Sequence, residues 1–269
     1  MKTTAWLALC LTAILSVPAA AQTPAPEVTL TRLDCGSGTN DPRRFSDTFA
    51  YNESSKPFTF SCYVIRHGSD VMVWDTGYLP GSVPNATNTP ITDLLKQMNV
   101  NPEDVKYVGI SHFHADHTGQ LAPMRNATLL IGKGDWDGIN ATPPMAGANV
   151  KGFAEWIAEN RKVEALTADK DVFGDGTVMV LRAPGHTPGH SSLLVRLKTK
   201  GPVLLTGDAV HFHENYKHEG VPSFNYDRAQ TIASIQRIKG IEKNLNATVI
   251  IQHDPRDIGK LPPFPAAAK

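Results

Sequence analysis

The chain has 269 residues, of which 41% are hydrophobic, and these values are typical of a globular protein with a full-sized core. Lysine and arginine together number 26, as do aspartate and glutamate, so the formal net charge is zero. Because no basic tract is present to attract phosphates, the sequence argues against a nucleic-acid partner.

The first 21 residues predict a secretory signal peptide. A lysine near the start is followed by an apolar run, residues 5–17, and by three alanines before Gln22. The apolar run is too short to span a bilayer, which favours a cleaved signal over the alternative of a membrane anchor. We therefore expect cleavage after Ala21, one domain over residues 22–269 without stable membrane insertion, and a secreted or periplasmic location.

Cleavage would leave two cysteines, Cys35 and Cys62, and both lie on segments that read as strands. In an oxidising compartment these thiols can form a disulfide. Two buried free thiols fit the sequence equally well, so their pairing stays open.

Strands and helices are expected in runs along the chain. Strands are predicted over residues 28–35, 58–67, 71–75 and 105–110, with a hairpin turn at 68–70 and a helix over 91–99. A strand over 127–132 and a helix over 151–162 follow. The rest comprises strands over 177–186, 191–197 and 202–208, a helix over 227–244 with Asp227 as its N-cap, and a last strand over 247–253. This order indicates a layered α/β protein.

Four of the predicted apolar strands end on a residue that can bind a metal ion. These residues are His112, His186, Asp208 and His253. In layered α/β proteins, binding sites commonly form at the edge where the carboxyl ends of the strands meet. We therefore expect the four side chains to converge at such an edge.

The segment after the first of these strands reads His-Phe-His-Ala-Asp-His over residues 112–117. In an extended chain, His112 and His114 point the same way and can reach one ion. Asp116 and His117 are neighbours at the expected start of a helix, which would direct them to a second point nearby. The spacing predicts two metal ions and differs from the helical H-E-x-x-H pattern of single-zinc proteases.

Six of the seven donors form two sets of three: His112, His114 and His186 for one ion, and Asp116, His117 and His253 for the other. The seventh donor, Asp208, can serve both ions. A carboxylate can bridge because it has two oxygens. Each ion then has four protein ligands, and a position is left for a shared water, as a catalytic site requires. A single histidine would be read as an ordinary polar residue, whereas seven donors at strand ends indicate a site.

These motifs resemble the metallo-β-lactamase fold superfamily. The resemblance rests on residues 112–117, on Gly-His-Thr-Pro-Gly-His at 185–190, on Thr-Gly-Asp at 206–208 and on His253. It implies an α/β fold in the form of a four-layer αβ/βα sandwich, with a binuclear centre between the two sheets. Two divalent ions are the expected cofactors. Zinc is the expected metal, although histidine–aspartate sites also accept iron, cobalt or manganese.

The same resemblance implies roles for two residues that are not ligands. The stretch Val-Trp-Asp-Thr-Gly at 73–77 is similar to the second hairpin of the family, in which the aspartate, here Asp75, holds the site. His190 is the second histidine of its motif, and the family uses the first as a ligand. His190 is therefore expected to orient neighbouring groups by hydrogen bonds.

Within the superfamily, the chain looks most like N-acyl-homoserine lactone hydrolases. That similarity is carried by residues 30–37, 58–81, 185–195 and 206–216. The implied reaction is opening of the lactone ring by a metal-bound hydroxide, with Asp116 carrying a proton to the leaving group. Such lactonases often have a tyrosine three residues after the bridging aspartate, where this chain has His211. An imidazole can donate the same hydrogen bond, so His211 is a candidate catalytic residue; the alternative is an ordinary loop histidine.

The stretch 211–227 has neither helical nor alternating periodicity and is rich in aromatic residues. Loops of this composition beside a site commonly line it. The candidate substrate-lining residues are Phe212, Tyr216, Phe224 and Tyr226. A packed cover over the edge of the sheet would use the same residues.

Three other functions fit parts of the pattern: β-lactam hydrolysis, thioester hydrolysis of the glyoxalase II type, and metal binding in the periplasm without catalysis. True β-lactamases of this fold generally lack a bridging carboxylate like Asp208. Glyoxalase II enzymes usually carry a helical C-terminal segment, which the short stretch after His253 does not resemble. The expected partner is a small molecule, an acyl lactone or another cyclic ester or amide. Acyl-chain length and oligomeric state stay open.

Overall fold

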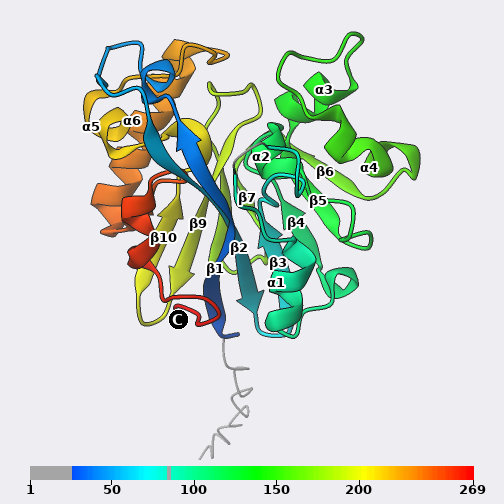
Figure 1. Ribbon diagram of the computed structural model, residues 1–269. Coiled ribbons are helices and arrows are strands. Elements are labelled where there is room, and N and C mark those ends of the chain that lie inside the picture. The colour runs from blue at the N-terminus through cyan, green and yellow to red at the C-terminus, as the bar shows by residue number, and fades with distance from the viewer. Residues whose placement is uncertain (1–25, 84–85) are drawn as a thin grey trace, which may run out of the picture.

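The computed structural model describes residues 26–83 and 86–269, so the predicted signal peptide lies outside the described residues. Two β-sheets pack face to face, and helices cover the outer face of each (Figure 1). The four-layer sandwich expected from the motifs is therefore confirmed. Among the described helices, none combines the length and the apolar character needed to cross a bilayer.

The first sheet has six strands in sequence order: β1 (Val28–Asn40), β2 (Lys56–His67), β3 (Asp70–Trp74), β4 (Tyr107–Gly109), β5 (Thr128–Gly132) and β6 (Val163–Leu166). β1, β2 and β3 are antiparallel, and β3 to β6 are parallel. The helices that accompany this sheet are α1 (Ile91–Gln97), α2 (Ala115–Thr118), α3 (Lys133–Asn140) and α4 (Ala154–Ala158). Short 3₁₀ turns are η1 (Pro42–Phe45), η2 (Pro102–Asp104) and η3 (Val150–Phe153).

The second sheet has five strands in the order β11, β10, β9, β8, β7. Their bounds are β7 (Lys170–Asp171), β8 (Val178–Arg182), β9 (Ser191–Leu197), β10 (Gly201–Leu205) and β11 (Thr248–Ile250). Only the β10–β11 pair is parallel. Helices α5 (His213–His218) and α6 (Arg228–Leu245) lie on its outer side, with 3₁₀ turns η4 (Gly207–Ala209) and η5 (Pro255–Lys260).

Successive side chains along a strand point to opposite faces of the sheet, so each sheet contributes to two separate cores. On the first sheet, Val64 and Val73 belong to the core shared with α1, whereas their neighbours Ile65 and Met72 belong to the core between the sheets. On the second sheet, Leu194 packs with the α6 residues in a third core. Both sheets are thus buried on both faces, which fixes the strand ends relative to one another.

A disulfide joins Cys35 on β1 to Cys62 on β2, with the two Cα atoms 5.9 Å apart. The strands are antiparallel neighbours, and Leu33 is paired with Cys62 in the ladder. The pairing that the sequence left open is therefore formed, and both cysteines lie in the core.

The structure differs from the predicted elements mainly in its short helices. The helix expected over 151–162 consists of η3 followed by α4, which ends at Ala158. Two further helices, α3 and α5, were not predicted. α3 contains Gly134 and Gly138, which have low helix propensity, and α5 lies inside the stretch expected to be irregular. The predicted N-cap is confirmed, because the Asp227 side chain accepts a hydrogen bond from the Gln230 amide at 2.9 Å.

Candidate metal centre

Histidine and aspartate side chains from both sheets converge at one edge of the sandwich. They form two groups, in each of which the donor atoms lie within 4.8 Å of one another: His112, His114, His186 and Asp208, and Asp116, His117, Asp208 and His253. The donors come from the segment after β4, from α2, and from the segments after β8, β10 and β11. All seven residues predicted as ligands are thus brought together, in the grouping expected from the sequence.

Asp208 connects the two groups through different oxygens. Its Oδ2 lies 3.7 Å from His112 Nε2 and 3.5 Å from His186 Nε2. Its Oδ1 lies 3.4 Å from His117 Nε2 and 2.9 Å from His253 Nε2. One carboxylate therefore serves both groups, which is the geometry of a bridging ligand.

Several of these donor atoms lack a hydrogen-bond partner among the described residues. His117 Nε2, His253 Nε2 and Asp208 Oδ1 are all buried and make no hydrogen bond, although Asp208 Oδ1 and His253 Nε2 lie 2.9 Å apart. Buried polar atoms almost always have a hydrogen-bond partner. Three unsatisfied atoms within one donor group therefore indicate that a binding partner such as a metal ion belongs there. Metal–ligand bonds of about 2.0–2.2 Å place neighbouring ligands of a tetrahedral site roughly 3.3–3.6 Å apart, close to the separations around Asp208. The donor set therefore fits divalent metal ions.

The charge distribution also favours cations. Burial disfavours a positive charge on His117, but three carboxylates outweigh it and raise the pKa of this imidazole well above its usual value: those of Asp116, Asp208 and Asp75. In the other group, burial lowers the pKa of His112 and His186 well below the usual value, so these rings are neutral and present lone pairs. Neutral imidazoles beside carboxylates are the usual ligands of zinc and similar ions.

Two ligand histidines each use Nδ1 in a hydrogen bond away from the site, which leaves Nε2 facing it. His117 Nδ1 lies 2.9 Å from Asp75 Oδ2, and Asp75 also accepts hydrogen bonds from the Ser111 amide and hydroxyl. His253 Nδ1 donates to the Thr59 carbonyl at 2.9 Å. Asp75, at a positive φ of 57°, thus orients a predicted ligand without facing the pocket itself.

His190 acts on the bridging residue. Its Nδ1 lies 2.8 Å from the Ala183 carbonyl, and its Nε2 accepts a hydrogen bond from the Asp208 amide at 2.9 Å. Burial lowers the pKa of His190 to about 4, in agreement with a neutral ring that donates at one nitrogen and accepts at the other. His190 therefore positions the backbone of Asp208.

Asp135, on α3, holds two ligand-bearing loops together and was not singled out from the sequence. Its carboxylate accepts hydrogen bonds from the Phe113 amide at 3.0 Å, the Thr187 hydroxyl at 2.8 Å and the Gly189 amide at 2.6 Å. Burial raises the pKa of Asp135 to about 7, although the three hydrogen-bond donors favour the ionised carboxylate and act to lower the pKa. Because α3 was not predicted, nothing in the sequence pattern pointed to this residue.

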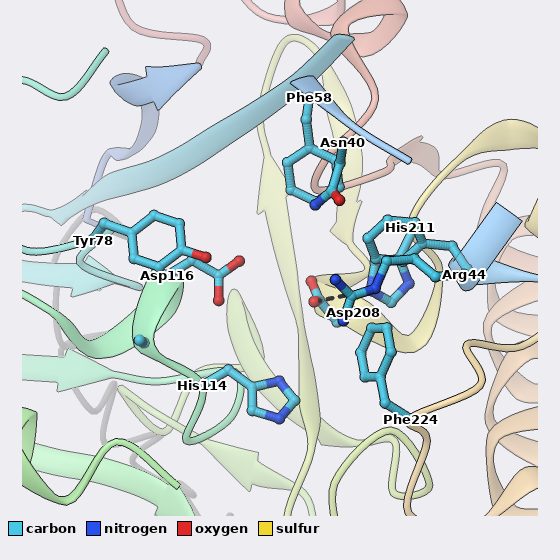
Figure 2. Close-up of a pocket in the computed structure, with 11 residues that line it drawn as sticks. Asn40, Arg44, Phe58, Tyr78, His114, Asp116, Asp208, His211 and Phe224 are labelled. Atoms are coloured by element: carbon cyan, nitrogen blue, oxygen red, sulfur yellow. Dashed lines mark ion pairs between the residues drawn. The ribbon is translucent and has the colours of Figure 1, made fainter. Parts of the chain in front are cut away.

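The two groups lie at the base of a cavity of about 260 Å³ (Figure 2). Its wall combines polar and aromatic side chains: Asn40, Arg44, Phe45, Phe58, Tyr78, His114, Ala115, Asp116, Asp208, His211 and Phe224. Asn40, Arg44 and Tyr78 were not identified from the sequence. Asn40 is the last residue of β1, and Arg44 and Tyr78 come from the segments after β1 and β3, where the sequence has no recognisable pattern. The cavity volume lies just below the lower end, about 300 Å³, of the usual range for small-molecule sites, so it suits a small ligand.

His211 lies in the wall of the cavity, with Nε2 3.2 Å from Asp208 Oδ2 (Figure 2). Its ring packs against Phe45, with centroids 4.6 Å apart. The ring contact with Phe45 thus holds His211 beside the Asp208 carboxylate.

Only one of the four aromatic residues expected to line the pocket does so. Phe224 lies in the wall, whereas Phe212 is fully buried in the core, where it packs against Phe45 and Phe58. The Tyr216 hydroxyl donates to Glu242 on α6. Tyr226 is 56% exposed and does not line the cavity. The expectation was wrong for these three: Phe212 is buried in the core, Tyr216 is directed toward α6, and Tyr226 is exposed to solvent.

A family model described as the metallo-beta-lactamase superfamily matches residues 57–253. The chain belongs to this superfamily. The match spans every predicted ligand, from His112 to His253, and the superfamily predicted from the motifs is thereby confirmed.

Among curated superfamily relatives, the N-acyl homoserine lactonase AttM of Azorhizobium caulinodans is 34% identical over 165 residues, which are 60% of this chain and 62% of the relative. An N-acyl homoserine lactonase of a Bacillus species is 32% identical over 210 residues, 72% of this chain and 80% of the relative. The chain thus spans less than two thirds of the length of the AttM relatives that it matches.

Solved structures with the same fold include a quorum-quenching N-acyl homoserine lactone lactonase, at a TM-score of 0.78 and 24% identity, covering 90% of this chain and 98% of that chain. Another is AidC, described as a dizinc quorum-quenching lactonase in complex with a product, at a TM-score of 0.70 and 17% identity, covering 91% of each chain. At these identities, the likeness supports the fold.

Proposed function

We propose that this chain is a metal-dependent hydrolase that opens the lactone ring of N-acyl homoserine lactones. One observation carries the proposal: Asp208 presents one oxygen to each of two donor groups at the base of a small-molecule cavity. Relatives that share 32–34% identity are named N-acyl homoserine lactonases, which supports this substrate class over β-lactams and thioesters.

The seven donors would hold two divalent ions, for which we propose zinc, because imidazole and carboxylate ligands suit it. Such ions, when bound, activate a water molecule for attack and polarise the ester carbonyl. His112, His114 and His186 form one side of the cradle and His117 and His253 the other. Asp75 and His190 keep the ligands in place through the hydrogen bonds described above.

Asp116 is the residue we propose for proton transfer. Its Oδ2 lies 3.4 Å from His117 Nε2 and 3.6 Å from His253 Nε2, and both contacts leave Oδ1 unused. Asp116 lies in the wall of the cavity, so Oδ1 can receive the proton lost by the attacking water. When the ester C–O bond breaks, the same oxygen delivers that proton to the leaving alkoxide, which yields the free hydroxy acid. His211 would restrain Asp208 during these steps.

The test compares substrates on one preparation. The purified chain, lacking residues 1–21, is assayed for bound metal and then for acid release from an acyl homoserine lactone, a β-lactam and a thioester in parallel. We expect two metal ions per chain and turnover of the lactone. Turnover of the β-lactam alone would overturn the lactonase proposal.

Asp208→Ala provides the matched test of the site. It removes the oxygen shared by the two donor groups, so we expect the loss of one bound ion and of most of the activity. Asp137→Ala is the control, since Asp137 lies on the exposed side of α3 and pairs with Lys133. Full metal content and activity in Asp208→Ala would show that this carboxylate does not bridge.

We also propose that the protein is exported to the periplasm or secreted. The Cys35–Cys62 disulfide supports this location, because such bonds persist in oxidising compartments. Cell fractionation of the full-length chain, with N-terminal sequencing of the product, tests both export and cleavage after Ala21. Recovery of the intact chain in the cytoplasm with free thiols would contradict the proposal.

A further inference from the structure

Tyr78 stands in the cavity wall beside Asp116, opposite His211 and Phe224 (Figure 2). Its ring packs edge-on against Phe60, with the centroids 4.9 Å apart, and its backbone carbonyl accepts a hydrogen bond from Asn88 Nδ2 at 2.7 Å. Packing against Phe60 therefore restrains the side chain, and the hydrogen bond from Asn88 restrains the backbone that carries it.

The segment that carries Tyr78 is fastened to the helix that carries Asp116. The Thr76 amide donates to the His117 carbonyl at 2.8 Å, and the Gly119 amide donates to the Gly77 carbonyl at 2.8 Å. A Cβ atom on Gly119 would lie 2.2 Å from the Leu79 nitrogen and 2.5 Å from the Tyr78 carbonyl carbon, so only glycine permits this approach. The phenol and the Asp116 carboxylate thus belong to one rigid unit.

The Tyr78 hydroxyl has no hydrogen-bond partner among the described residues, although the hydroxyls of Tyr51 and Tyr216 both donate to side chains. A phenol is protonated at neutral pH and can donate. His211, the donor expected from the sequence, is instead engaged with Asp208. Among the described residues, the Tyr78 hydroxyl is therefore a free hydrogen-bond donor in the cavity beside Asp116.

We propose that Tyr78 is a catalytic residue that donates a hydrogen bond to the leaving oxygen of the lactone as the ring opens. The inference rests on the proposed lactonase function. As the C–O bond breaks, negative charge develops on the ring oxygen, and the phenol O–H stabilises it without giving up its proton. Asp116 then supplies the proton, so the alkoxide leaves as an alcohol and Tyr78 is unchanged. A donor fixed in advance at a developing charge commonly contributes about 10²–10³-fold to kcat.

Ligand binding tests the contact directly. The ring-opened product, an N-acyl homoserine, carries the former leaving oxygen as a hydroxyl, whereas an N-acyl-2-aminobutyrate lacks only that hydroxyl. We expect the metal-loaded wild-type protein to bind the hydroxy acid several-fold more tightly in calorimetry, as one hydrogen bond allows, and Tyr78→Phe to bind the two alike. Persistence of the preference in Tyr78→Phe would overturn the proposal.

The ratio of kcat for two substrates provides a second readout, and this ratio does not depend on the amount of folded protein. In Tyr78→Phe, kcat for the oxygen lactone should fall by about 10²-fold, and kcat for the corresponding thiolactone by much less, because a thiolate is a better leaving group and a weaker acceptor. Tyr226→Phe is the control, since Tyr226 lies outside the cavity. Metal content and Tm should match the wild type in both variants.

The outcomes separate this inference from the proposed function. If the wild-type chain opens lactones and Tyr78→Phe does so equally fast, the role of Tyr78 is wrong and the lactonase proposal stands. An equal fall with lactone and thiolactone would mean that the phenol contacts another part of the substrate, which also overturns the proposal. If the wild type opens no lactone, both proposals fail.

Discussion

Arg44 is a cationic side chain in the wall of the cavity, and its guanidinium is stacked on aromatic rings. The guanidinium carbon lies 4.8 Å from the Phe224 ring centroid and 5.8 Å from that of Phe45. No carboxylate among the described residues forms an ion pair with it, whereas neighbouring Arg43 pairs with Asp41. A stacked, unpaired guanidinium is pre-organised to donate to a carbonyl oxygen of a ligand.

Replacing Arg44 should weaken substrate binding and leave the chemical steps intact. For Arg44→Ala we expect KM for an acyl homoserine lactone to rise about 5–10-fold with little change in kcat, the effect of one lost hydrogen bond. Arg43→Ala, on the same turn, is the control and should behave as the wild type. Steady-state kinetics of the two variants decide the matter: a fall in kcat with unchanged KM would contradict a binding role.

At the level of residues, the ligand set was readable from the sequence because each donor stands at the end of an apolar strand or within six consecutive positions. The wall of the cavity was not. Tyr78 and Arg44 reach the site from connecting segments, whose paths depend on contacts such as Gly119 against Leu79 that no periodicity reveals. Phe212 shows the converse, since its position beside the site in sequence did not prevent its burial in the core.

The short helix α3 connects two of the loops that carry predicted metal ligands. Through Asp135 it fixes the loop that contains His112 and His114 and the loop that contains His186. Asparagine has the same shape but only one acceptor oxygen, and its NH₂ group would face one of the three donors. The buried donor left unpaired costs about 1–3 kcal/mol.

Asp135→Asn should therefore lower the free energy of unfolding by about 1–3 kcal/mol and weaken metal binding, although the residue contacts no predicted ligand side chain. Denaturant titration of the metal-free protein and competition with a metal chelator measure the two effects. Asp137→Asn, two positions along the same helix and exposed, is the control and should change neither. A fully stable Asp135→Asn with normal metal affinity would contradict a positioning role.

Among the elements, those with a strong periodic or capping signal were predicted correctly. α6 has the capping aspartate and a row of isoleucines, and the core strands are uninterrupted apolar runs. α3 and α5 were missed because tertiary contacts, including Asp135 on α3 and the Asn215 side chain on α5, stabilise sequences with weak helix propensity. These contacts join residues far apart in the sequence, so no local pattern reveals them.

For the whole molecule, the site has an energetic consequence. Folding buries the carboxylates and the unpaired donor atoms of the centre, and without cations these groups destabilise the native state. Metal binding to the native state alone should raise Tm in proportion to the logarithm of free metal concentration, by an amount equivalent to about 2.7 kcal/mol at 100 times Kd.

Removal of metal with a chelator should accordingly lower Tm and abolish lactone turnover, and added zinc should restore both. Scanning calorimetry at several zinc concentrations measures the shift. Asp208→Ala should show a smaller zinc-dependent rise, because it lacks the shared ligand. An identical Tm with and without metal would contradict the view that these donors form a metal site.

His253 enters the site from β11, the last strand, whereas His112 follows β4 in the other sheet. The cradle is therefore complete only when both halves of the sandwich have docked. A chain that stops short of this point has no high-affinity place for a second ion. Tight metal binding therefore depends on the docking of both sheets, so the metal content of a preparation measures its fraction of fully assembled chains.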